Sequence, residues 1–86
     1  MQSISTADVG RRVREKIREV FRLSPEEAGG DLRLGSPPRW DSLGHMELLV
    51  ALEREFGLTF SVSVISRMTT VDEIIRAVQT HARSQP

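Results

Sequence analysis

The chain has 86 residues, of which 12 are Lys or Arg, 12 are Asp or Glu, none is Cys and 38% are hydrophobic. This length predicts a single domain, residues 1–86, with one modest core, and the balanced charge argues against a nucleic-acid module. The absence of cysteine excludes disulfides and thiolate metal sites. No signal peptide or membrane-spanning run is evident, so we expect a cytoplasmic protein that does not bind membranes.

The first predicted element is an amphipathic helix over about residues 6–22. Apolar residues recur there at helical spacing, at Val9, Val13, Ile17, Val20 and Phe21. A connection over residues 23–41 follows, and its prolines and glycines exclude a long regular element. Basic residues predominate over 8–22 and acidic residues over 41–56, which predicts two distinct charged faces.

The second helix is predicted over residues 42–56. Asp41 is a favourable N-cap residue, and Gly57 is a favourable residue just past the helix end. The apolar positions form a broad stripe along this helix, which is the strongest helical pattern in the chain.

Two further helical segments complete the predicted fold. The stretch 62–65 predicts one helical turn, and Thr70 with Glu73 forms a capping box at the start of a helix over about 71–83. Helices of this length are marginal alone, so their apolar stripes must pack together. The expected fold is all-α: a small four-helix bundle of three main helices and one short one, with a long loop between the first two.

The polar residues Asp41, Ser42 and His45 raise the possibility of a hydrolase, because positions 42 and 45 share a helix face. However, the chain has no Gly-x-Ser-x-Gly pattern. The simpler interpretation of His45 and His81 is that both are partly exposed helix residues. Two histidines without cysteine do not make a zinc site, and we expect no metal site.

Ser42 has a favourable position for a covalently attached phosphate. Its hydroxyl lies in the first turn of a helix, where unpaired amides and the helix dipole favour an anion by ~0.3–1 kcal/mol. From the residues alone the alternative stays open that Asp41 is only an N-cap and Ser42 an ordinary first-turn residue.

The stretch DSLGHMEL at 41–48, followed by LVALEREFG at 49–57, resembles the acyl carrier protein family, and so does TTV at 69–71. The resemblance implies a 4′-phosphopantetheine arm on Ser42, flanked by Asp41 and Leu43 and installed from coenzyme A by a separate phosphopantetheinyl transferase. By the same resemblance the protein is not an enzyme. It would hold acyl or aminoacyl groups as thioesters, with fatty, polyketide, amino-acid and hydroxy-acid cargo all compatible.

The resemblance also implies partners: an acyl- or aminoacyl-loading enzyme, and downstream synthases or transferases. Family members often carry an acid where this chain has Gly44, and this chain has no net charge. We therefore expect a monomeric, stand-alone carrier of a dedicated biosynthetic pathway, with a less charge-driven interface. The predicted partner-binding residues are Gly44, His45, Met46, Glu47 and Arg67.

The same reasoning predicts a pocket for the acyl chain, because each CH2 group buried between the helices contributes about 0.8 kcal/mol. The candidate lining residues are Leu43, Met46, Val50, Phe60, Ile65, Ile74, Ile75 and Val78. The alternative is that these residues only pack on one another. Two alternatives to the carrier function also stay open, a helical interaction module that keeps the bundle without the arm and a small hydrolase that uses Ser42 and His45.

Overall fold

The computed structural model describes residues 6–84, with side chains for residues 8–81. The helices in this range are α1 (Thr6–Phe21), α2 (Pro25–Ala28), α3 (Ser42–Phe56), α4 (Val62–Ile65) and α5 (Val71–Ser84). Strands are absent from this range, and the predicted all-α class is confirmed. None of the described helices is both long and apolar enough to cross a membrane.

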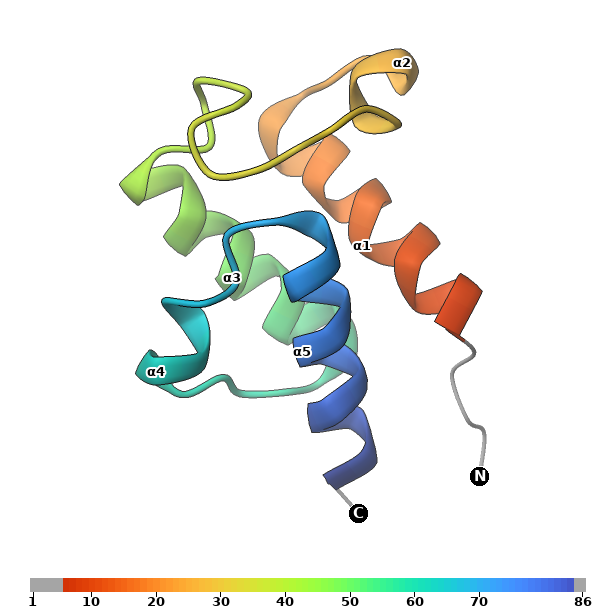
Figure 1. Cartoon of the computed structure of the whole chain (residues 1–86), viewed down its shortest axis with the longest axis vertical. Coiled ribbons are helices and arrows are strands. Elements are labelled where there is room, and N and C mark those ends of the chain that lie inside the picture. The colour runs from red at the N-terminus through yellow and green to blue at the C-terminus, as the bar shows by residue number, and fades with distance from the viewer. Residues whose placement is uncertain (1–5, 85–86) are drawn as a thin grey trace.

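Helix α1 contacts both α3 and α5 and runs antiparallel to them (Figure 1). Its predicted apolar stripe faces the core: Val9, Val13, Ile17 and Phe21 are buried, and Val20 packs against them. Leucines of α3, branched residues of α5 and several residues of the connections, among them Trp40, Phe60 and Met68, form the rest of the core. The predicted bundle is therefore organised around α1.

The ends of α3 follow the local sequence signals. Asp41 is the N-cap, and its Oδ1 atom accepts a hydrogen bond from the Gly44 amide at 2.8 Å. Gly57 ends the helix in the left-handed region, at φ 66°, and its amide donates to the Glu53 carbonyl. A positive φ suits glycine because it has no Cβ atom.

The long connection before α3 is more ordered than its composition predicts. It contains α2, which was not predicted, although Ser24 and Glu27 form a capping box around Pro25. Further along, the Leu34 amide donates to the Thr69 carbonyl at 2.8 Å, which ties the connection to the residues before α5.

The prediction of two separate charged faces is wrong where α1 meets the end of α3. Arg12 Nη2 lies 2.9 Å from Glu55 Oε2, and Lys16 Nζ lies 3.6 Å from Glu55 Oε1. The long basic side chains of α1 reach across to the acidic end of α3, so the two charged segments partly neutralise each other within the fold.

Candidate functional site

Ser42 is the first residue of α3, and its side chain is exposed. By helix geometry the amides of Ser42 and Leu43 have no acceptor within the helix, whereas the Gly44 and His45 amides both bond to Asp41. Two free amides and the positive end of the helix dipole thus lie beside an accessible hydroxyl. This arrangement suits a phosphodiester on Ser42.

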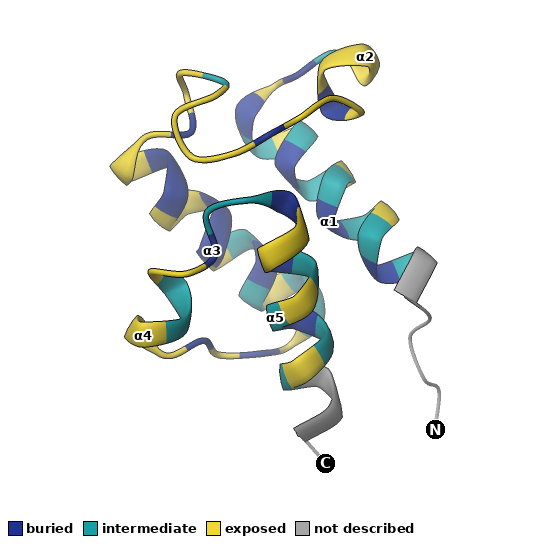
Figure 2. Cartoon of the chain, viewed as in Figure 1, coloured by how far each residue is buried: buried dark blue, intermediate teal, exposed yellow. Residues whose placement is uncertain are grey.

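Exposed residues predominate in the connection before α3 and continue through Ser42 and Leu43 at the start of the helix (Figure 2). The chain directly before it is held firmly. The Arg39 side chain donates to the Phe21 carbonyl at 2.9 Å, and the Gly35 amide donates to the Trp40 carbonyl at 2.7 Å. These two hydrogen bonds therefore fix the main chain that leads into Ser42.

Gly44 is buried, and its close packing also fixes the main chain before Ser42. A Cβ atom at residue 44 would collide with the carbonyl oxygen of Arg39 and would come within 2.9 Å of the Phe21 ring. The glycine lets the main chain before Ser42 lie directly on α3. Gly44 is consequently not part of an exposed partner-binding surface, and that prediction is wrong.

His45 is also inside the protein, with only 8% of its surface exposed. Its Nδ1 atom lies 3.0 Å from Trp40 Nε1, and its Nε2 atom lies 3.2 Å from the Ile65 carbonyl oxygen. The prediction of a partly exposed histidine at position 45 is wrong, and so is its placement on the partner-binding surface. Because both ring nitrogens are engaged, neither is available to activate Ser42, and this geometry removes the basis of the hydrolase hypothesis.

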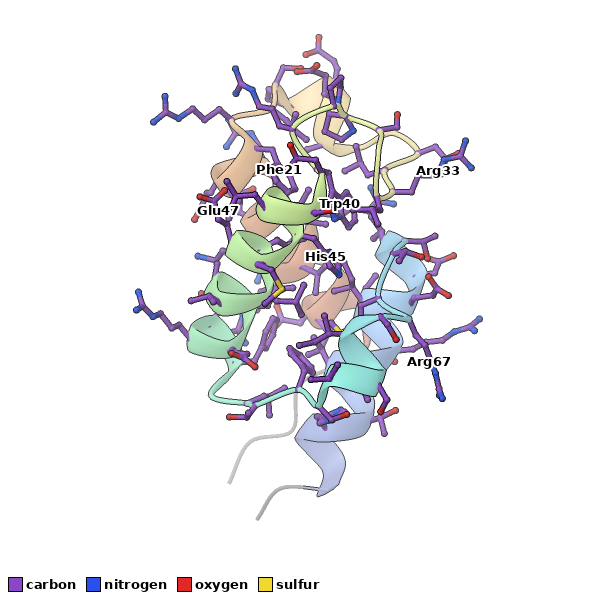
Figure 3. The ribbon with its side chains drawn as sticks, turned by 90° about the vertical axis from the view of Figure 1, so that its left-hand side faces the viewer. Phe21, Arg33, Trp40, His45, Glu47 and Arg67 are labelled. Atoms are coloured by element: carbon purple, nitrogen blue, oxygen red, sulfur yellow. The ribbon has the colours of Figure 1, made fainter. Side chains whose placement is uncertain are left out.

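The sequence does not predict the structural role of Trp40. This residue is fully buried and stacks between the rings of Phe21 and His45 (Figure 3). Its nearness to Ser42 in the sequence was a signal, but nothing local to the sequence indicates that its indole nitrogen meets His45.

The residues predicted to line an acyl pocket divide between the outer face of α3 and the core. Leu43, Met46 and Val50 are 72%, 50% and 44% exposed, so they lie on the outer face of α3 and do not line an interior. The other predicted residues are in or against the core: Phe60, Ile74 and Val78 are buried, and Ile65 and Ile75 are partly buried. The prediction therefore placed residues of the outer face of α3 and residues of the core in one site.

A groove of about 380 Å³ lies elsewhere, between α4 and α5. It is lined by Val64, Arg67, Met68, Glu73, Arg76, Ala77, Thr80 and His81. None of the eight predicted pocket residues lines it.

Of the three acidic residues of α3, one is exposed and two accept hydrogen bonds from other parts of the fold. Glu47 is exposed, on the opposite side of the view in Figure 3 from Arg33 and Arg67. Glu53 accepts a hydrogen bond from the Phe60 amide at 2.9 Å. Hydrogen bonding from Arg12, with the charge of Lys16 nearby, holds the pKa of Glu55 below its ordinary value. Glu47 is thus the acid of α3 that remains available at the surface.

Residues 39–78 match the family model of the phosphopantetheine attachment site. This segment begins just before Trp40, includes Ser42 and reaches into α5. The acyl carrier protein of Wolinella succinogenes is 26% identical to this chain over 69 residues, which cover 80% of this chain and 91% of that protein. Together with the all-helical fold, these findings support the acyl carrier protein family for this chain, and the matched family model is that of the 4′-phosphopantetheine attachment site.

Proposed function

We propose that Ser42 is the residue that carries the 4′-phosphopantetheine group, and that the chain is a stand-alone carrier of acyl or aminoacyl intermediates in a dedicated biosynthetic pathway. The observation that supports this most directly is the exposed Ser42 hydroxyl at the start of α3, beside two amides without a helical acceptor. The negative charge of Asp41 is partly compensated by the helix, because its carboxylate accepts a hydrogen bond from the Gly44 amide.

Attachment of the arm is a phosphoryl transfer. The Ser42 oxygen forms a bond to the phosphorus next to the pantetheine of coenzyme A, the pyrophosphate bond breaks, and adenosine bisphosphate leaves. The serine proton passes to a base of the phosphopantetheinyl transferase. Once attached, the arm supplies a terminal thiol for thioester formation.

The test is intact-mass spectrometry of protein incubated with coenzyme A, magnesium and a broad-specificity phosphopantetheinyl transferase. We expect one added phosphopantetheine on the wild-type chain and none on Ser42→Ala. Ser63→Ala is the matched control, because Ser63 is also an exposed serine in the first turn of a helix; this variant should be modified fully. A folded wild-type chain of unchanged mass would contradict the proposal and favour an interaction module without the arm.

We propose further that partners dock on a mostly apolar face that starts next to Ser42. Leu43, Met46 and Val50 follow one side of α3, and Glu47 is the exposed acid of the same helix, whereas Arg67 follows α4 and lies on the other side of the view in Figure 3. A chain with no net charge has little long-range steering. Rates of transfer to or from partner enzymes should therefore change little with ionic strength. A steep fall in rate with added salt would contradict this part of the proposal.

We propose that residues 1–86 act as one monomeric carrier domain. The buried residues of α1, α3 and α5 form a single cluster, which supports one core for the described part of the chain. Light scattering coupled to size-exclusion chromatography should give the mass of one chain, and a dimer mass at micromolar concentration would contradict the proposal.

A further inference from the structure

A continuous line of buried contacts runs from the residue before the attachment turn to α4. Trp40 Nε1 lies 3.0 Å from His45 Nδ1, and His45 Nε2 lies 3.2 Å from the carbonyl oxygen of Ile65, the last residue of α4. Trp40 and His45 are both buried. The imidazole thus touches the main chain of α4 on one side and the turn that contains Ser42 on the other.

The chemistry of the partners determines which nitrogen carries the proton. An indole nitrogen only donates hydrogen bonds, so His45 Nδ1 must accept from Trp40. A carbonyl oxygen only accepts, so Nε2 carries the proton and donates to Ile65. The neutral ring therefore satisfies both contacts at once, and the opposite tautomer would lose both.

Packing leaves the imidazole little freedom to move independently. Its ring stacks on Trp40 at 6.2 Å between centroids, and Trp40 stacks on Phe21 at 5.8 Å. Next to it, Gly44 lies directly against the main chain of Arg39. A displacement of His45 would consequently move the chain on both sides of Ser42.

We propose that His45 is a positioning residue, which couples the orientation of the Ser42 turn to the position of α4 through its two ring nitrogens. The proposal rests on the proposed function only in that Ser42 is taken as the attachment residue. Its consequence is reciprocal: a partner or cargo that displaces α4 changes how Ser42 is presented, and a partner that grips the Ser42 turn changes α4.

Two substitutions separate the two contacts. The side-chain oxygen of Asn lies close to the position of Nδ1, so His45→Asn keeps an acceptor for Trp40 and loses the reach to α4. The side-chain nitrogen of Gln lies close to the position of Nε2, so His45→Gln keeps a donor to Ile65 and loses the acceptor. His81→Gln is the matched control, because His81 lies on α5 and bonds to the Ala77 carbonyl.

The first measurement is amide hydrogen exchange on the full, unmodified chain. We expect His45→Asn to speed amide exchange after α4, at Ser66 and Met68. We expect His45→Gln to speed amide exchange at positions 44 and 45. Under the proposal each variant also raises exchange, to a smaller extent, on the side whose contact it retains. Exchange that changes on one side alone, or on neither, would overturn the coupling.

The second measurement is the rate of arm attachment to the same variants. Both His45 variants should lower kcat by up to about a hundredfold, the scale expected when a reacting group is misplaced, with a smaller change in KM because the docking face of α3 is intact. His81→Gln should match wild type. Wild-type kinetics in both His45 variants would overturn the positioning role.

Nitrogen NMR of the wild-type imidazole requires no variant to fold. We expect an unprotonated Nδ1 and a protonated Nε2, and a protonated Nδ1 in the neutral ring would overturn the proposal. The exchange and NMR experiments use protein without the arm, so they are independent of the attachment site. If wild type acquires no arm but the coupled exchange is observed, the proposed function fails and the coupling stands.

Discussion

Gly44, in the first turn of α3, packs so closely on Arg39 that a Cβ atom at position 44 would overlap the Arg39 carbonyl oxygen. The constraint is spatial and not conformational, because residue 44 is helical and has an ordinary backbone conformation. The close approach brings Trp40 into the core and leaves Ser42 outside it. The packing of Gly44 thus determines how the turn that contains Ser42 lies on the bundle.

Replacement of Gly44 by alanine should lower the free energy of unfolding by about 2–3 kcal/mol, because main-chain atoms must move to admit the methyl group. Gly10→Ala is the matched control: its Cβ would meet only Ile75 Cδ1, at 3.5 Å, which is an ordinary contact. Alanine is also the better helix former by about 1 kcal/mol. Urea denaturation should therefore show a loss at position 44 and none at position 10, and equal effects at both positions would contradict this explanation.

The Arg12–Glu55 contact should make stability depend on pH in the acid range. Because the pKa of Glu55 is lowered in the folded state, chiefly by the hydrogen bond from Arg12, its contribution is complete above the ordinary glutamate pKa of about 4.3. The contribution is lost as the pH falls through the lower, folded-state value. We expect Glu55→Gln to cost about 0.5–1 kcal/mol at pH 7 and much less at pH 3.

Denaturant unfolding of wild type and Glu55→Gln at several pH values measures this difference. Glu26→Gln is the control, since Glu26 is exposed on α2. A difference between wild type and Glu55→Gln that stays constant from pH 7 to pH 3 would show that the ionised carboxylate is not the cause.

Substitutions on the exposed side of α3 should affect transferase kinetics, and substitutions on its buried side should affect stability. Met46 is half-exposed, so Met46→Gln should change stability by no more than about 0.5 kcal/mol but should raise the KM for arm attachment. Leu49 is buried, and Leu49→Ala should cost about 2–5 kcal/mol. Thermal unfolding and transferase kinetics on both variants make the comparison. An unchanged KM for Met46→Gln would argue against a docking role for this face.

The modified protein should carry a single reactive thiol. The chain has no cysteine, so the terminal thiol of the arm has no competitor. One equivalent of a maleimide reagent should react with the modified wild-type chain, and Ser42→Ala should take up none after the same transferase treatment. Labelling of the Ser42→Ala variant would place the arm on another residue.

Local signals predicted the helix ends well because capping depends on a few neighbouring residues. Asp41 and Gly57 bound α3 as expected, and the helical turn at 62–65 is present. The same chemistry was available for α2, where Ser24 and Glu27 form a capping box, but the segment 25–28 lacks the run of apolar side chains that the segment 62–65 has.

The orientation of α3 was not predictable from its sequence. Apolar residues occur nearly all round this helix, so periodicity alone does not distinguish the side of Met46, which is exposed, from the side of Leu48, which is buried. Contacts between segments make that choice, above all the fit of Gly44 under Arg39. The burial of His45 has the same origin, because its partners are Trp40 and the main chain of α4.

Trp40 is the only tryptophan in the chain, and it lies against His45 two residues before the proposed attachment serine. Its emission spectrum is therefore an intrinsic optical signal from this one place in the molecule. Loading of cargo, docking of an enzyme or release of α4 can each be followed by fluorescence in real time, on the native protein and without an added dye.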